Sequence, residues 1–168
     1  MNQKLRLNVL KTLLLFLESE ILDYEIIIDK VNRKVIEIKS EFPFIYQCRI
    51  IYNVEENKLW FQIENSVQIC NAKYQIFKHF YHLYCKFQPP VEWVSHVSIA
   101  KNGLFTTWSA IHLEEIEELN IELIEHYYHS TLIRFNSFFI GVREIYQSNK
   151  TAEEAMAEVQ RKSNASIH

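Results

Sequence analysis

The sequence predicts a single α+β domain with a mainly antiparallel sheet of about five to six strands. Three observations lead to this prediction. Apolar residues recur at helical spacing in separate segments, runs of β-branched residues lie between those segments, and short turn sequences join the runs in pairs. Helices and strands segregated in this way are typical of the α+β class. At 168 residues the chain is long enough for one hydrophobic core.

Helices are expected at the start of the chain, in its middle and near its end, and they would pack against the sheet. Asn71 is a candidate N-cap for the middle helix. Thr151 and Glu154 have the spacing of a capping box at the start of a short last helix. The expected helical segments are residues 3–20, 72–87, about 116–147 and 151–158.

Six segments rich in β-branched and aromatic residues are expected to form the strands. In one of them Leu59, Phe61 and Ile63 alternate with Trp60 and polar residues, which fits a sheet with one face better buried than the other. The segments are 24–29, 34–40, 46–54, 58–65, 91–100 and 104–113, with Asn102-Gly103 as the clearest hairpin turn.

The boundaries of the domain and of its first strands follow from the same pattern. Residues 1–162 are expected to form one domain, and residues 163–168 a frayed tail. The pattern leaves open whether residues 24–40 form one bent strand or two. Either arrangement gives the same fold class.

Charge and composition argue against several classes of function. The formal net charge is −3, so no strong positive field would draw the chain to nucleic acid or to an anionic membrane. The longest uninterrupted apolar run, Leu13–Leu17, is too short for a membrane span or a secretion signal. We therefore expect a cytoplasmic protein that binds neither nucleic acid nor a membrane.

Signatures of catalysis are also missing from the sequence. There is no GxSxG, Walker A or GxGxxG motif, and only two glycines are present to build a phosphate loop. Cys48, Cys70 and Cys85 form no CxxC pair, and we interpret them as buried apolar side chains. We expect no enzyme, no catalytic residue and no cofactor.

One polar cluster contains the residue types of a metal or acid/base site. In the stretch IELIEHYYHSTLIRFNSFF (121–139), Glu122, Glu125, His126 and His129 share one face, with glutamate and histidine paired at i,i+4 spacing. The HExxH and Glu-x-x-His patterns of metal sites are absent. We interpret this face as solvated and expect no bound metal. Another face of the helix carries an apolar seam: Ile121, Ile124, Tyr128, Leu132, Phe135, Phe139, Val142 and Tyr146.

The middle helix has an apolar arc wider than packing on one sheet requires. The surplus is either covered by another helix of the same chain or serves as a dimer or client surface, and the sequence leaves both readings open. Its polar side carries His79 and His82, which we interpret as a solvated strip. The candidate interface residues on the arc are Ile76, Phe77, Phe80, Tyr81, Tyr84 and Phe87.

The order of elements resembles that of the YbjN family and of the related type III secretion chaperone-like fold. The resemblance covers about residues 20–160. It includes the strand ending in KLWFQIEN, the aromatic helix YQIFKHFYHLYCKF, the hairpin segment VSIAKNGLFTTWSAIHLE and the closing helix before TAEEAMAE. If KVNR (30–33) forms a turn, this chain has one more strand pair near its start than the usual pattern of the family.

This resemblance implies a non-enzymatic binding protein, chaperone-like or a signalling regulator, which acts through apolar helix and sheet surfaces. Proteins of the chaperone fold are small cytoplasmic homodimers that hold an extended client segment. The expected partners are thus a second copy and a protein client. Two alternatives remain: a metal-dependent protein using the polar face above, and a small-ligand pocket between sheet and helices lined by Trp60, Trp93 or Trp108.

Overall fold

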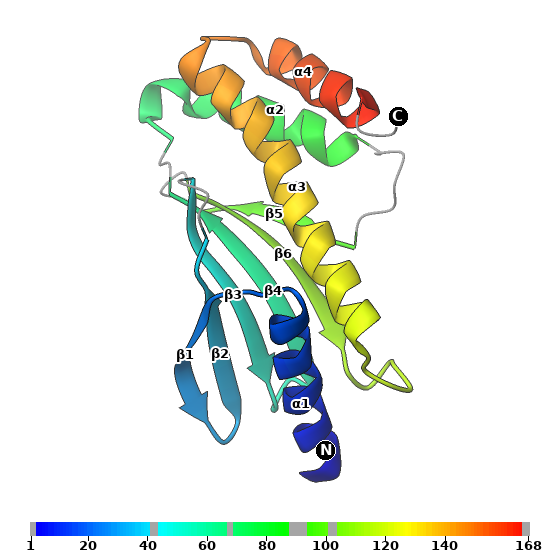
Figure 1. The fold of residues 1–168 in the computed structure, drawn as a ribbon. Coiled ribbons are helices and arrows are strands. Elements are labelled where there is room, and N and C mark those ends of the chain that lie inside the picture. The colour runs from blue at the N-terminus through cyan, green and yellow to red at the C-terminus, as the bar shows by residue number, and fades with distance from the viewer. Residues whose placement is uncertain (1–2, 41–43, 67–68, 88–93, 101–103, 166–168) are drawn as a thin grey trace.

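The computed structural model describes residues 3–40, 44–66, 69–87, 94–100 and 104–165, and it confirms the α+β class (Figure 1). Within these residues the elements follow the predicted order, with two separate strands between residues 24 and 40. They are α1 (Gln3–Ser19), β1 (Tyr24–Lys30), β2 (Arg33–Ile38), β3 (Ile45–Asn53), β4 (Lys58–Asn65), the short 3-10 helix η1 (Asn71–Lys73), α2 (Tyr74–Lys86), β5 (His96–Ile99), β6 (Phe105–His112), α3 (Ile121–Gln147) and α4 (Ala152–Ala165).

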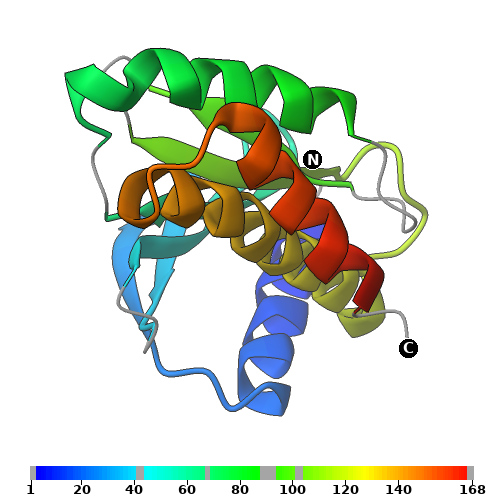
Figure 2. The same ribbon diagram turned by 90° about the horizontal axis from the view of Figure 1, so that it is seen from above.

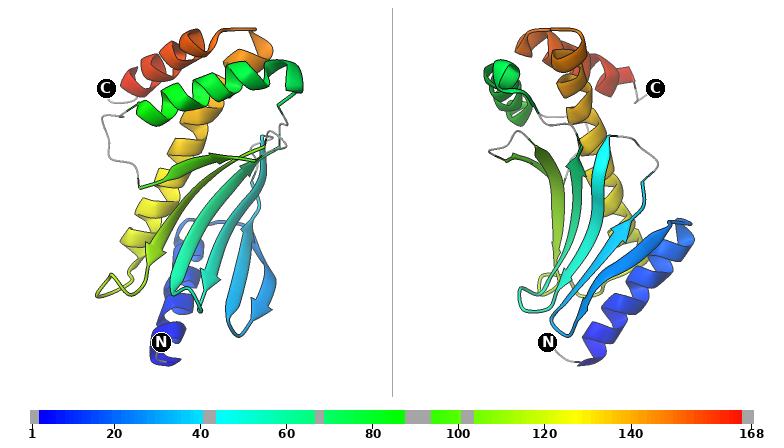
Figure 3. Two further views of the ribbon diagram at one scale, coloured as in Figure 1. Left: turned by 180° about the vertical axis from the view of Figure 1, so that it is seen from behind. Right: turned by 90° about the vertical axis from the view of Figure 1, so that its left-hand side faces the viewer.

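The six strands form one antiparallel sheet in the order β1-β2-β3-β4-β6-β5. Helix α1 and the first half of α3 pack on one face of this sheet (Figure 1). None of the described helices covers the other face, which is seen directly from behind (Figure 3, left). We call this uncovered surface the open face.

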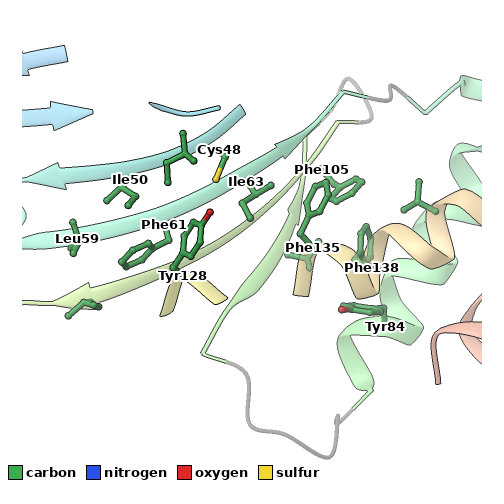
Figure 4. Close-up of a cluster of buried hydrophobic side chains, with 14 of the residues drawn as sticks. Cys48, Ile50, Leu59, Phe61, Ile63, Tyr84, Phe105, Tyr128, Phe135 and Phe138 are labelled. Carbon is green, nitrogen blue, oxygen red and sulfur yellow. The ribbon is translucent and has the colours of Figure 1, made fainter. Parts of the chain in front are cut away.

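The alternation predicted for β4 is confirmed. Leu59, Phe61 and Ile63 are fully buried on the side of the helices, whereas Trp60 and Gln62 are only half-buried on the open face. Strands β3 and β6 alternate in the same way. The core therefore lies between the sheet and α1 and α3, where Tyr128 meets Cys48 and Phe61 (Figure 4).

A second layer of helices lies beyond one end of the sheet. Figure 2 shows α2, α4 and the second half of α3 packed together. Phe138 stands at the centre of this layer, with its ring 4.9 to 5.9 Å from the rings of Phe77, Phe80 and Tyr84. It also contacts Phe105 of the sheet at 4.8 Å, so one core joins both layers.

The buried side of α3 differs in part from the predicted seam. Phe138 and Ile145 are buried, whereas Phe139 is half-buried and Tyr146 is exposed. The reason is that α3 leaves the sheet and continues against α2 and α4, so the side of the helix that is in contact changes along its length. A helix segment that is apolar on most sides is typical of burial under more than one element.

Some of the predicted helix ends are confirmed and others are wrong. The capping box of α4 is present, because Thr151 N donates to Glu154 at 2.8 Å and Glu154 N donates to Thr151 at 3.3 Å. Asn71 is not an N-cap, since it begins η1. Helix α3 starts at Ile121 rather than near 116, because the Asn120 side chain caps it there. Helix α4 continues to Ala165, beyond the expected domain end at 162.

Candidate binding face of the sheet

Half of the candidate interface residues on α2 lie inside the protein. Phe77, Phe80 and Tyr84 are 1%, 0% and 0% exposed, because α3 and α4 cover them. Of the two readings left open by the sequence, coverage by the chain's own helices applies to these three residues. Ile76 remains exposed, while Tyr81 and Phe87 are half-buried.

The polar face of α3 does not gather into a site. His129 Nε2 lies 3.3 Å from the Glu20 carboxylate just after α1, which ties α3 to another element. Glu122 and His126 are exposed and Glu125 is half-buried. Among the described residues, no three His, Cys, Asp or Glu side chains are placed to hold a metal ion.

The cysteines also differ in part from expectation. Cys48 is buried beside Tyr128, and burial raises the pKa of its thiol from 9.0 to about 12. Cys70 and Cys85 are exposed. The buried thiol is held in its unreactive, protonated form at neutral pH.

The open face carries two tryptophans in contact. Trp60 and Trp108 occupy the open-face positions of the neighbouring strands β4 and β6, and their ring centroids are 5.3 Å apart. The Lys58 ammonium lies 5.4 Å from the Trp60 ring centroid, and the His96 ring lies 4.8 Å from Trp108. These contacts make a continuous aromatic patch on a side of the sheet that no described helix covers.

A hollow of about 500 Å³ lies over this patch. Its lining combines apolar rings with hydroxyl, amide and charged groups from five strands and one turn. The lining residues are Arg33, Ile51, Asn53, Glu56, Trp60, Gln62, Ser98, Thr106 and Trp108. We call this site the tryptophan hollow.

The charges around the hollow are mixed in sign. Arg33 and Glu56 both line it, and Arg49 on the same face is paired with Glu37 at 3.1 Å. Such a surface can receive both donors and acceptors of a peptide or a small polar molecule. It lacks the dense positive charge that binding to a phosphate backbone requires.

The small-ligand pocket considered from the sequence, lined by Trp60, Trp93 or Trp108, was expected on the wrong side of the sheet. Trp60 and Trp108 lie on the open face and not between sheet and helices, and Trp93 lies outside the described residues. The available signal was the strand alternation itself. Trp60 occupies the phase of β4 that otherwise carries polar residues such as Gln62. Both phases of β6 contain polar residues, so alternation gives this signal for Trp60 and not for Trp108.

Comparisons with known proteins support the fold. No protein-family model matches the sequence, and a search of curated proteins finds no match. Among solved structures, the chain is similar to the crystal structure of YbjN from E. coli, for which a role as a transcription regulator has been suggested. The match has a TM-score of 0.50 and 8% identity, and it covers 77% of this chain and 87% of that one.

At this identity the similarity to YbjN shows a shared fold. The expected resemblance is thus confirmed at the level of architecture. A search of the helices in the described parts of the chain finds none long and apolar enough to span a bilayer.

Proposed function

We propose that this protein is a non-catalytic, cytoplasmic binding module, chaperone-like or regulatory, that holds a segment of a partner protein on the open face of its sheet. The observation that carries the proposal is the tryptophan hollow, a concave site floored by Trp60 and Trp108 on an uncovered sheet. Tryptophan is the residue most enriched among the few that dominate protein–protein binding energy.

The other candidate surfaces support the proposal less well. The aromatic residues of α2 are largely occupied by the chain's own core, and the polar face of α3 forms no cluster. The open face combines a large apolar floor with polar groups at its border, which is the composition of a protein–protein interface. The fold shared with YbjN, a suggested regulator, is consistent with a binding role.

A peptide selection tests this proposal. Random linear peptides displayed on phage would be selected on the wild-type protein alone, and the selected peptides would then be tested on the Trp60→Ala/Trp108→Ala variant. We expect peptides that bind the wild type and lose about 2 kcal/mol or more of binding free energy on the variant, measured by calorimetry. Circular dichroism would verify that the variant is folded.

The matched control is Ile133→Ala, which removes an exposed apolar side chain from α3. Binding to this control should equal binding to the wild type. Peptides that bind the double tryptophan variant as tightly as the wild type would contradict the proposal.

Binding of a small molecule is the second candidate function, because the volume of the hollow falls within the range of about 300–1,000 Å³ found for ligand pockets. A panel of nucleotides, sugars and amino acids would be screened by thermal shift. A compound that stabilises the wild type but not the double tryptophan variant would favour this candidate over a protein partner.

A further inference from the structure

The outer edge of β1 is open to pairing. Strand β1 spans Tyr24–Lys30 and forms one edge of the sheet, and no other described element lies beyond it (Figure 1; Figure 3, right). An edge strand has backbone N–H and C=O groups that lack a neighbour in the sheet. The strand at the opposite edge, β5, is shorter and spans only His96–Ile99.

Apolar side chains accompany this edge. Ile26 and Ile27 of β1 are 44% and 41% exposed, and Val31 in the turn that follows is 89% exposed. Contact with another strand would remove this surface from water, which favours association. Neither proline nor a covering helix protects the edge among the described residues.

The hydrogen-bond pattern identifies the groups that point outward. Lys39 N donates to Asp23 O at 2.8 Å, so the backbone groups of Asp23 and, two residues later, Glu25 face β2. Those of Ile26 then face outward, because the direction alternates along an antiparallel strand. A bulge interrupts the register between Ile26 and Ile28. Beyond it Asp29 faces outward, because the alternation along β2 from Lys39 turns Val35 and Arg33, the partners of Ile28 and Lys30, toward β1.

The bulge restricts which strand can pair here. Outward groups of a regular strand recur every second residue, whereas Ile26 and Asp29 are three apart. An antiparallel copy of β1 has the same spacing. In this register Ile26 lies opposite Asp29 of the second copy, and Asp29 lies opposite its Ile26. The residue that the bulge inserts between Ile26 and Ile28 then lies at the centre of the paired segment in both strands.

Charge is also complementary in this register. Glu25 lies opposite Lys30 of the second copy, and the reverse pair forms at the other end. Both residues are exposed, and their partners in β2, Glu37 and Arg33, occupy open-face positions, so Glu25 and Lys30 lie on the same face of the joined sheet. Opposite charges facing each other across strands are stabilising, and like charges are destabilising.

We propose that the protein forms a two-fold symmetric dimer in which β1 pairs antiparallel with β1 of a second copy. The two six-stranded sheets would join into one, with both open faces on the same side. Because the same edge is used by both copies, the association closes at two chains and does not continue into a fibre. The dimer surface is separate from the tryptophan hollow.

Charge reversal with rescue tests the register. The mass of the full chain would be measured by light scattering and sedimentation over a concentration series. We expect twice 20.2 kDa for the wild type. Glu25→Lys and Lys30→Glu should each weaken the dimer by about tenfold or more, because each creates two like-charge pairs. The double variant Glu25→Lys/Lys30→Glu should restore the dimer.

Two further measurements sharpen the test. The effect of each single variant should shrink in about 1 M salt, where the screening length falls to about 3 Å. Glu118→Lys, in an exposed position between β6 and α3, is the control and should stay dimeric. The Trp60→Ala/Trp108→Ala variant should stay dimeric too, so that failure of this proposal and failure of the binding-face proposal can be distinguished.

The proposal is overturned if the wild type is a monomer at every concentration. It is also overturned if the dimer persists unchanged in both single variants, or if the double variant is no better than the single ones. Circular dichroism on each variant would show whether loss of the dimer is caused by unfolding. If a single variant unfolds, the double variant still tests the register, because it is expected to be dimeric.

Discussion

At the scale of single residues, Lys73 links the start of α2 to the end of α3. Its Nζ donates to the carbonyl oxygens of Ile145 and Tyr146, both at 2.8 Å, and to the side chain of Asn149 at 2.6 Å. The ammonium thereby satisfies carbonyl groups at a helix C-terminus, where a positive charge is also favoured by the helix dipole.

We predict that Lys73→Met lowers the free energy of unfolding by about 1–2 kcal/mol, since it removes charge-assisted hydrogen bonds in a half-buried position. Urea denaturation measures this loss. Lys78→Met is the matched control, because Lys78 is exposed on α2, and its effect should stay within about 0.5 kcal/mol. Equal losses in the two variants would contradict the role of Lys73.

A second residue-scale prediction concerns pH. Burial raises the pKa of the Cys48 thiol to about 12 in the folded protein, against 9.0 in the unfolded chain. Above pH 9 the unfolded chain therefore releases a proton that the folded protein keeps, so the free energy of unfolding falls as pH rises from 9 toward 12. This contribution has a slope of at most about 1.4 kcal/mol per pH unit.

The Cys48→Ala variant should lose stability less steeply than the wild type just above pH 9. Denaturation at several pH values would give both slopes. Burial also raises the pKa of Tyr84 and of Tyr128, and both residues are present in the wild type and in the variant. Because Cys48 also raises the pKa of Tyr128, the difference between the slopes reports the thiol together with its interaction with this tyrosine. Identical slopes would show that the thiol does not titrate differently in the two states.

At the scale of elements, the close contact between α2 and α3 depends on Gly141. A Cβ at this position would lie 2.1 Å from Phe80 Cζ, and Phe80 is completely buried. Alanine would normally stabilise a helix interior by about 1 kcal/mol relative to glycine. Here the overlap forces the two helices apart, and overpacking of this kind costs about 1–3 kcal/mol.

We predict that Gly141→Ala destabilises the protein, with a net loss of up to about 2 kcal/mol in the free energy of unfolding after the helix gain is subtracted. Adding Phe80→Leu should make the alanine less harmful, and a double-mutant cycle measures this coupling. A Gly141→Ala protein that is more stable than the wild type would show that the contact is looser than described.

The elements themselves could be predicted well from the sequence because their signals are local. The capping box joins Thr151 to Glu154, three residues away, and the alternation of β4 spans only eight residues. The coverage of α2 depends instead on Phe138, more than fifty residues beyond Phe80. The start of α3 was misplaced for a smaller reason, because residues 116–120 are also compatible with a helix and the cap at Asn120 decides.

At the scale of the whole molecule, Phe138 joins the sheet to the helical layer. It is completely buried between Phe105 and the rings of α2. We predict that Phe138→Ala lowers the free energy of unfolding by about 3–5 kcal/mol. Phe139→Ala is the matched control. Phe139, one residue later, is only half-buried, so its loss should be clearly smaller.

Denaturation of the two variants distinguishes the observed packing of α3 from the seam predicted by periodicity, in which Phe139 and not Phe138 is a core residue. A larger loss for Phe139→Ala would favour the predicted seam. The sequence could not decide between them, because the direction in which α3 leaves the sheet depends on where α2 and α4 lie.

The same limit applies to the candidate site. Alternation in β4 shows that Trp60 lies on the side opposite the apolar residues Leu59, Phe61 and Ile63. In β6 both phases contain polar residues, so the side of Trp108 follows from the pairing of β6 with β4 and not from its own strand. Whether that side is covered depends on which face of the sheet the helices pack against, and this is settled by the complete chain. The sequence could thus identify the two aromatic residues as candidates, but not their position on an open face.

The central claim is that the open face is the binding surface. The most direct measurement is nuclear magnetic resonance mapping of the isotope-labelled protein with a peptide selected as described above. We predict that signals of the Trp60 and Trp108 indole N–H groups and of β3, β4 and β6 shift on binding, whereas those of α2 and α4 do not. Shifts concentrated on α2 or on the polar face of α3, with the indole signals unchanged, would contradict the claim.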